Sequence, residues 1–219
     1  MKCYPRLFPL LFVIPLLSVA AVLPARSQDL AAPVCELVIY DESVDLEDFK
    51  IDVDLARSNF EAYQKIFRMI EGLWEGKTIP RMDYTKAKYD QDAAGLELER
   101  AGLLLKMQAA LVEQYRLICN SANMDTDERE QAIRDAYLQY RSSDCDSKAK
   151  SIEVAETNLE YYREYLKSIL ELKREKFATD VQVVLAELDV ELEEKNLADA
   201  KRRTGICRAE LEDLESRKK

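Results

Sequence analysis

The chain has 219 residues, of which 47% are hydrophobic and 34% charged, with five glycines and a formal net charge of −10. The negative charge disfavours nucleic acid as a partner. The chain has no histidine, which removes the usual general base, the usual zinc ligand and every Ser/His or Cys/His nucleophile pair. We therefore expect a non-enzymatic protein without cofactor or metal, and the abundance of Ala, Glu, Lys, Leu and Arg is typical of long helices.

The N-terminus has the pattern of a secretory signal peptide. A short basic start precedes an apolar run over residues 7–23, and a small-x-small pattern ends at Ser27. Cleavage after Ser27 would leave an exported chain with no membrane span. An uncleaved membrane anchor is the alternative, but two prolines interrupt the run.

Four stretches carry apolar residues at spacings of mostly three and four, which is typical of helices that pack through an a/d seam. The first stripe comprises Phe49, Val53, Ala56, Phe60, Tyr63, Phe67, Ile70 and Trp74. The second comprises Ala87, Ala94, Leu98, Ala101, Leu105, Val112 and Tyr115, with Gln91 and Gln108 as polar interruptions. The third comprises Ile152, Ala155, Leu159, Tyr162, Leu166, Ile169 and Phe177. The fourth comprises Val183, Ala186, Val190, Leu197, Ala200, Thr204, Leu211 and Leu214.

Two short breaks in this pattern predict tight turns. At the first, Gly76 is expected to end a helix in the left-handed conformation and Pro80 to begin the next in its first turn. At the second, Thr179 or Asp180 is expected to cap the new helix. The predicted fold class is therefore all-α, with two long antiparallel coiled-coil hairpins in a four-helix arrangement.

The predicted hairpins cover residues 47–119 and 145–217, after an N-terminal segment at 28–46. The connector at 120–144 is expected to contain a short helix over residues 126–141, because Asp125 and Glu128 have capping-box spacing. The acidic stretch over residues 41–54 lacks the spacing and the glycine of a calcium loop. We expect it to be a solvated face at a helix start, where the macrodipole favours acids.

Four cysteines follow the signal region, and an even number in an exported chain predicts two disulfides. In an antiparallel hairpin, residues at one height are equidistant from the turn. Cys35 and Cys119 are equidistant from residue 77, and Cys145 and Cys207 from residue 176. This favours a staple across each hairpin. Pairing of Cys119 with Cys145 and of Cys35 with Cys207 would instead clamp the two hairpins together, and crossed pairing is the third connectivity.

The second predicted helix also carries apolar residues off its seam. These are Leu96, Leu103, Leu104, Leu111 and Ile118. If the hairpins pack on each other, they are internal contacts; if not, they form an exposed apolar stripe that needs a partner.

The segment GLWEGKTIPRMDYTKAKYDQDAAGLELERA resembles the periplasmic tip of TolC-type outer-membrane efflux proteins, where a helix ends at a glycine, turns and resumes around an aspartate and alanines. Residues 174–215 resemble the second tip and its descending helix, notably Val184, Leu185 and Ala186 with Asn196, Leu197, Ala198 and Ala200. A weaker likeness is to the hairpins of HlyD-type membrane-fusion adaptors. The chain departs from both families, because it carries no alternating strand pattern for a barrel or lipoyl domain, and Ala178 and Thr179 replace the glycine of the second tip.

The resemblance implies a periplasmic protein, secreted across the inner membrane, that belongs to efflux or secretion machinery of the cell envelope. It further implies a homotrimer with a hollow cylinder of helices, although without barrel strands a conducting tunnel is not expected. The hairpin tips would dock adaptor-like helical hairpins through Gly76, Lys77, Thr78, Arg81, Ala178, Thr179 and Asp180. The alternative function is a stand-alone periplasmic helical scaffold or binding protein without a transport role.

Overall fold

The structure is a computed structural model that describes residues 32–120 and 124–217. The predicted signal peptide at residues 1–27 therefore lies outside the described residues. The described chain forms four helices: α1 (Ala32–Glu75), α2 (Arg81–Asn120), α3 (Thr126–Arg174) and α4 (Asp180–Ser216). No strand occurs among these residues, and the predicted all-α class is confirmed.

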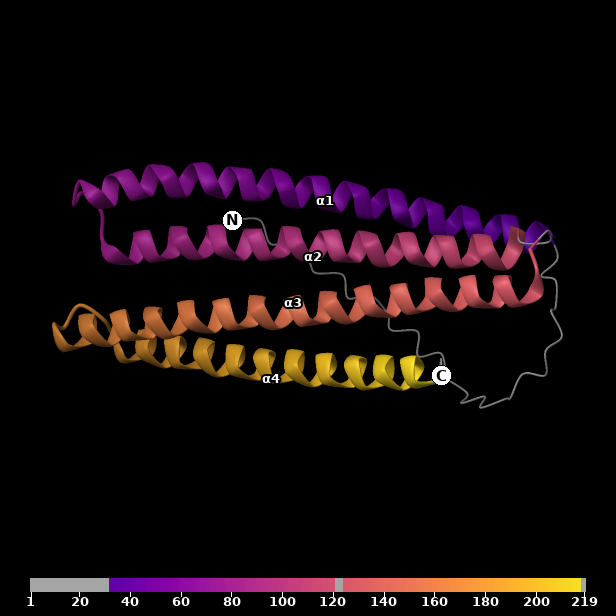
Figure 1. The fold of residues 1–219 in the computed structure, drawn as a ribbon. Coiled ribbons are helices and arrows are strands. Elements are labelled where there is room, and N and C mark those ends of the chain that lie inside the picture. Colours follow the sequence, from indigo (N-terminus) through magenta and orange to yellow (C-terminus); the bar gives the residue numbers. More distant parts are fainter. Residues whose placement is uncertain (1–31, 121–123, 218–219) are drawn as a thin grey trace.

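The four helices lie side by side in a single layer and alternate in direction (Figure 1). Helix α1 packs on α2, α2 on α3, and α3 on α4. In the part of the chain that the structure describes, α1 does not pack against α3 or α4, nor α2 against α4. The arrangement is therefore an array and not a four-helix bundle. Its longest helix, α3, has 49 residues and spans about 74 Å at 1.5 Å per residue.

The predicted apolar stripes form the seams between neighbouring helices. Ala87 and Val112 of α2, Ala155, Leu159 and Ile169 of α3, and Ala186 and Thr204 of α4 are buried. Most other seam residues are half-buried, because a single layer gives each helix few neighbours. Bulky residues of α1 face small ones of α2: a Cβ atom added to Gly95 would lie 3.2 Å from the Phe60 ring.

One seam position is polar, and its amide nitrogen is hydrogen-bonded. Gln108 is only 4% exposed, and its Nε2 donates to the Glu42 backbone carbonyl at 3.1 Å and to Glu42 Oε2 at 2.8 Å. A buried amide left without a partner costs free energy, so this pair favours one register of α1 on α2.

Two predicted boundaries are wrong. Helix α1 begins at Ala32, so the described part of the predicted N-terminal segment, residues 32–46, belongs to α1, and the acidic stretch lies within the body of α1 and not at its start. The connector helix predicted over residues 126–141 is not a separate element, because α3 runs without a break from Thr126 to Arg174. Asp125 does cap α3, accepting from the Asp127 backbone N–H at 2.9 Å. Polar residues interrupt the heptad pattern over residues 126–144, but no glycine or proline is present there to end the helix.

The off-seam residues of α2 lie between the two hairpins. Leu96, Leu103, Leu104, Leu111 and Ile118 are all half-buried, and α2 packs along α3. Polar contacts cross the same interface, including the Lys150–Glu99 ion pair at 2.7 Å and the Tyr89 hydroxyl donating to Asn158 Oδ1 at 2.6 Å. These five residues are therefore contacts inside the molecule, as expected for hairpins that pack on each other.

Disulfides join Cys35 to Cys119 and Cys145 to Cys207, with Cα–Cα distances of 5.6 and 5.5 Å. This is the connectivity that the midpoints favoured. Each bond ties one edge helix to its inner neighbour, α1 to α2 and α4 to α3, and neither joins the two hairpins.

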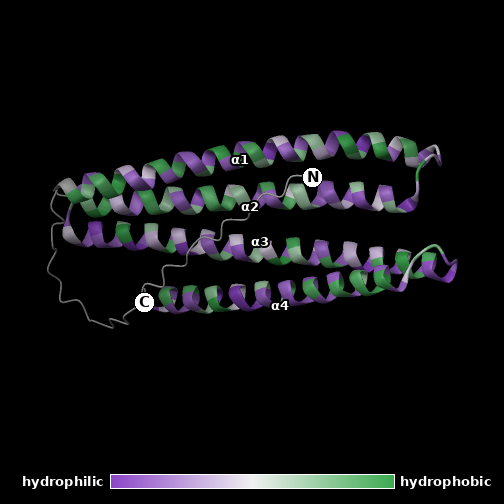
Figure 2. Ribbon diagram, turned by 180° about the vertical axis from the view of Figure 1, so that it is seen from behind, coloured by the Kyte–Doolittle hydropathy of each residue, from purple (hydrophilic) through white to green (hydrophobic). Residues whose placement is uncertain are grey.

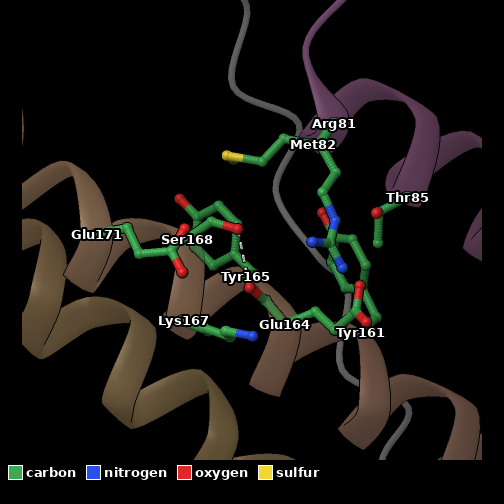
Figure 3. A pocket seen from close by; sticks show the side chains of 9 residues that line it. All are labelled: Arg81, Met82, Thr85, Tyr161, Glu164, Tyr165, Lys167, Ser168 and Glu171. Atoms are coloured by element: carbon green, nitrogen blue, oxygen red, sulfur yellow. Dashed lines mark hydrogen bonds between the residues drawn. The ribbon is translucent and has the colours of Figure 1, made fainter. Parts of the chain in front are cut away.

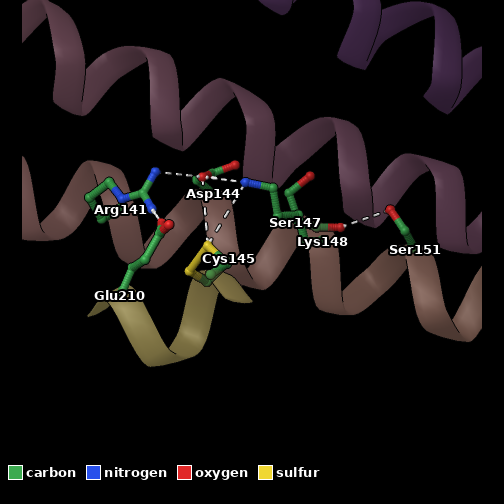
Figure 4. Close-up of polar contacts among 8 residues, drawn as sticks. Arg141, Asp144, Cys145, Ser147, Lys148, Ser151 and Glu210 are labelled. Atoms are coloured by element: carbon green, nitrogen blue, oxygen red, sulfur yellow. Dashed lines mark hydrogen bonds and ion pairs between the residues drawn. A yellow bond between two sulfur atoms is a disulfide. The ribbon is translucent and has the colours of Figure 1, made fainter. Parts of the chain in front are cut away.

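Charged side chains surround the second disulfide (Figure 4). Asp144 Oδ2 accepts from Lys148 Nζ at 2.6 Å and from Arg141 Nη1 at 3.2 Å, and Arg141 also pairs with Glu210 of α4. The Arg141 and Asp144 side chains are only 17% and 16% exposed. Of these three ion pairs, Arg141–Glu210 joins α4 to α3 beside the covalent bond, and the other two lie within α3 and orient Arg141 and Asp144. None of the described helices has a stretch long and apolar enough to cross a bilayer.

Candidate functional site: the hairpin tips and the cleft beside them

The two turns at the far end of the array have the same backbone design. Each has five residues between its helices, 76–80 and 175–179. In the first, the Lys77 N–H donates to the Trp74 carbonyl at 2.9 Å and the Thr78 N–H to the Leu73 carbonyl at 3.0 Å. This pair of hydrogen bonds defines a Schellman motif.

The second turn repeats the motif in a different sequence. The Lys176 N–H donates to the Lys173 carbonyl at 3.0 Å, and the Phe177 N–H donates to the Leu172 carbonyl at 2.8 Å. The two hairpins therefore end in equivalent caps although the turn sequences, GKTIP and EKFAT, have only the lysine in common at matching positions.

A lysine occupies the left-handed position of both turns. Lys77 has φ 55° and Lys176 has φ 65°, whereas no described glycine has positive φ. The left-handed residue of the first turn was predicted to be Gly76, but it is the next residue, Lys77. A non-glycine residue in this conformation costs about 1–2 kcal/mol, and such residues concentrate where a side chain has a task. A cation at this position also interacts favourably with the helix C-terminus.

The starts of the following helices differ from one another. Pro80 directly precedes α2, and its carbonyl accepts from the Asp83 N–H at 3.2 Å, so it caps α2 and does not lie in its first turn as predicted. Thr179 is the N-cap of α4 and forms a capping box with Gln182. Of the two predicted caps, Thr179 is therefore the one used.

The structure places most of the predicted tip residues at the surface. Gly76, Lys77, Thr78, Arg81, Thr179 and Asp180 are exposed, and Ala178 is half-buried. Thr78 Oγ1 donates to the Leu73 carbonyl at 2.8 Å, and Asp180 pairs with Lys173. These two side chains stabilise the tips themselves, while Lys77 is exposed in the turn and Arg81 is exposed and lines a cleft beside it.

Sequence reasoning missed the most prominent apolar residue at the tips. Phe177 was predicted as a seam residue because it fits the heptad spacing, but it follows the left-handed Lys176 and lies in the turn. It is 78% exposed, the highest value among the large hydrophobic residues described. Its place at the end of a hairpin makes this aromatic ring available for contact with a partner.

A cleft lies beside the first tip, between the start of α2 and the third quarter of α3. Its larger part has a volume of about 250 Å³ and is lined by Trp74, Arg81, Tyr84, Tyr89, Tyr161 and Glu164, among others. A smaller hollow of about 60 Å³ continues it toward the second tip. Figure 3 shows Arg81 extending from α2 toward the α3 side chains Tyr161 and Glu164.

Stacked aromatic rings form the walls of this cleft. Trp74 stacks on Tyr84 with ring centroids 5.4 Å apart, and Tyr89 stacks on Tyr161 at 4.4 Å. Burial, with smaller contributions from nearby tyrosines and carboxylates, raises the pKa of Tyr89 to about 12. Burial likewise raises the pKa of Tyr161, partly opposed by Lys86. Both hydroxyls are neutral at neutral pH, and that of Tyr89 donates to Asn158 Oδ1 across the interface between α2 and α3.

The described residues contain no group of three or more Cys, Asp, Glu or His side chains placed to hold a metal ion. The aspartates of the 41–54 stretch lie along α1, where Asp54 pairs with Arg57 at 3.0 Å. The chain matches no protein-family model, no curated protein and no solved structure in the three comparisons made.

Proposed function

We propose that this chain is an exported, non-catalytic helical scaffold that docks a protein partner of the cell envelope through its two hairpin tips. The observation that carries the proposal is the pair of matched turns at one end of the array. Each exposes a lysine in a strained left-handed conformation, and the second also exposes Phe177. Rigid elements that present a few charged and aromatic side chains at their ends are well suited to docking.

The setting that we propose is the periplasm, with the chain as a component of efflux or secretion machinery. This setting rests on the resemblance of the tip segments to TolC-type proteins and on the N-terminal signal pattern. Two long hairpins whose seams pack as antiparallel coiled coils would hold the tips at a fixed distance from the base. Partner helices with an acidic, apolar end would complement Lys77, Arg81, Lys176 and Phe177.

The test reverses the charge of the two turn lysines, which leaves the free-energy cost of the left-handed backbone similar. The double variant K77E/K176E retains a non-glycine residue at both left-handed positions, and F177S removes the aromatic ring. The matched control is K65E, an exposed lysine of α1 ten residues before the end of the helix. Each protein is used as bait in envelope extract after chemical cross-linking, and captured proteins are quantified. We expect partners captured by the wild type and K65E to be lost with the tip variants. Equal capture by all baits would refute docking through the tips.

The aromatic cleft favours a second candidate, a stand-alone binding protein with no transport role. Stacked tyrosines and Trp74, with Arg81 and Glu164 at the rim, suit a peptide or an aromatic ligand. Substitution Y161A opens the cleft without touching either turn. Loss of a captured partner with Y161A but not with the tip variants would favour this alternative.

A further inference from the structure

The two edge helices of the array carry apolar faces that no described part of the chain covers. Inner helices α2 and α3 have neighbours on two sides, and both of their apolar sides are used. Helices α1 and α4 have one neighbour each, yet they are also apolar on the side that faces away from it. Helices α1 and α4 thus have two apolar sides, as the inner helices do, although they lie at the edges of the array.

The outward face of α1 runs along most of the helix. It consists of exposed residues spaced so that they lie opposite the seam formed by Phe49, Val53 and Phe60. Its members are Leu37, Tyr40, Val44, Ile51, Leu55, Ile66, Met69 and Leu73. Figure 2 shows hydrophobic positions recurring along this helix.

The outward face of α4 is apolar over its tip-side half and at one position further down. It lies opposite the seam residues Ala186 and Val190. Its members are Val181, Val184, Leu185, Leu188, Leu192 and Ile206, all exposed. Figure 2 shows the hydrophobic positions gathered in the part of α4 near the turn.

The cross-links between helices place the two faces at the same heights. Arg129 of α3 donates to the Ile118 carbonyl, next to Cys119, which is bonded to Cys35. Cys145 lies sixteen residues beyond Arg129 in α3 and is bonded to Cys207 of α4. Sixteen residues beyond Cys35, about 24 Å up α1, is Ile51. Ile51 of α1 and Ile206 of α4 are therefore level.

The other apolar residues then match in antiparallel order. Moving equal distances toward the tips from Ile51 and Ile206 brings Met69 level with Leu188. By the same count, Ile66 comes level with Leu192 and Leu73 with Leu185, each within one residue. Four apolar pairs thus match between Ile51 and Leu73, whereas Leu37, Tyr40 and Val44 lie near or past the level at which α4 ends.

Charges beside the level isoleucines are opposite in sign. Asp48 and Asp52 lie beside Ile51 on α1, and both are exposed. Arg202 and Arg203 lie one turn from Ile206 on α4, with side chains 64% and 66% exposed. Both arginines pair with the same residue, Asp199, so they have capacity for further carboxylates. The apolar face of α1, with aspartates beside it, therefore fits the face of α4, with arginines beside it. It fits a second α1 less well, because the aspartates of the two copies would repel each other.

We propose that the outward face of α1 binds the outward face of α4 of a second copy of this chain. The contact continues the alternation of directions within the array, since α1 and α4 are antiparallel (Figure 1). Because the two surfaces differ, the contact is heterologous, and successive copies form a closed ring or an open ribbon of helices. Self-assembly of this kind leaves both tips free, and it does not depend on the tip-docking function.

The first experiment is cross-linking between two variants that each carry one added cysteine. Purified I51C and I206C proteins, with native disulfides verified by peptide mapping, are mixed and mildly oxidised. We expect a covalent dimer joined between positions 51 and 206, at least tenfold more than either protein gives alone. The control pair is K50C with R208C, exposed positions at similar heights but off the two outward faces. Equal cross-linking by I51C alone would mean an α1–α1 contact and overturn the proposal, as would a yield no greater than that of the control pair.

The second experiment measures mass by light scattering over a dilution series. We expect the disulfide-intact wild type to exceed the monomer mass at tens of micromolar concentrations. M69E and L188E should each weaken association by about tenfold or more, with helix content unchanged by circular dichroism. N196E, which adds the same charge to an exposed position of α4 off the outward face, should associate like the wild type. A wild type that is monomeric throughout would overturn the proposal.

Discussion

Removal of the Cys145–Cys207 disulfide tests how α4 is held. Helix α4 packs only on α3 among the described helices, so this bond, one seam and the ion pairs across that seam, Arg141–Glu210 among them, carry its attachment. The bond closes a loop with a sequence separation of 62, for which the chain-entropy relation gives about 4 kcal/mol. The exposed ion pairs Arg163–Glu194 and Lys201–Glu156 add at most about 1 kcal/mol each.

The double variant C145S/C207S should therefore lose about 2–5 kcal/mol, and the loss should be local. In hydrogen exchange read by mass spectrometry, amides of α4 should lose protection while those of α1 keep it. C35S/C119S is the matched control and should give the reverse pattern. Unchanged protection of α4 in C145S/C207S, or a uniform loss over all four helices, would refute the view that each edge helix is stapled separately.

Three further predictions concern single side chains. F60A should cost about 2–3 kcal/mol, less than a fully buried phenylalanine because Phe60 is only half-buried; an unchanged melting temperature would contradict its place in the seam. K77G and K176G should each stabilise the protein by about 1 kcal/mol by relieving the left-handed strain, and a loss of stability in chemical denaturation would contradict the assigned turn geometry. Since the pKa of Tyr89 is raised to about 12, the free energy of unfolding should fall as pH rises from 10 toward 12, and Y89F should show a smaller fall in the same denaturation series.

Much of the fold could be predicted because it depends on local periodicity. The spacing of Phe49 to Trp74 and of the three later stripes gave the seams, and the midpoints of the cysteine pairs gave the disulfides. Boundaries were harder, because the polar stretch before Cys145 keeps a helical backbone although it lacks a seam pattern. The left-handed positions were missed because glycine is the usual residue there, and here lysine is used beside Gly76.

The candidate site was predicted only in part. The tip residues from Gly76 to Arg81 follow from the break in the heptads. The cleft could not be predicted. Tyr161 is far from Tyr84 and Tyr89 in sequence, and these residues meet only because α2 packs along α3. The single-layer arrangement was likewise hidden, since the same amphipathic pattern is compatible with a bundle.

The distance between α1 and α4 tests the single-layer arrangement most directly. Spin labels at N59C and A198C, exposed positions at about the same height, would be measured by double electron–electron resonance. Labelled protein would be diluted in an excess of unlabelled protein so that only distances within one chain contribute. Three interhelical spacings of 8–10 Å separate edge helices of an array, which predicts about 24–30 Å between their axes. Labels a single interhelical spacing apart, seen as strong dipolar broadening of the continuous-wave spectrum and loss of the resolved distance, would mean a closed bundle and would contradict the account.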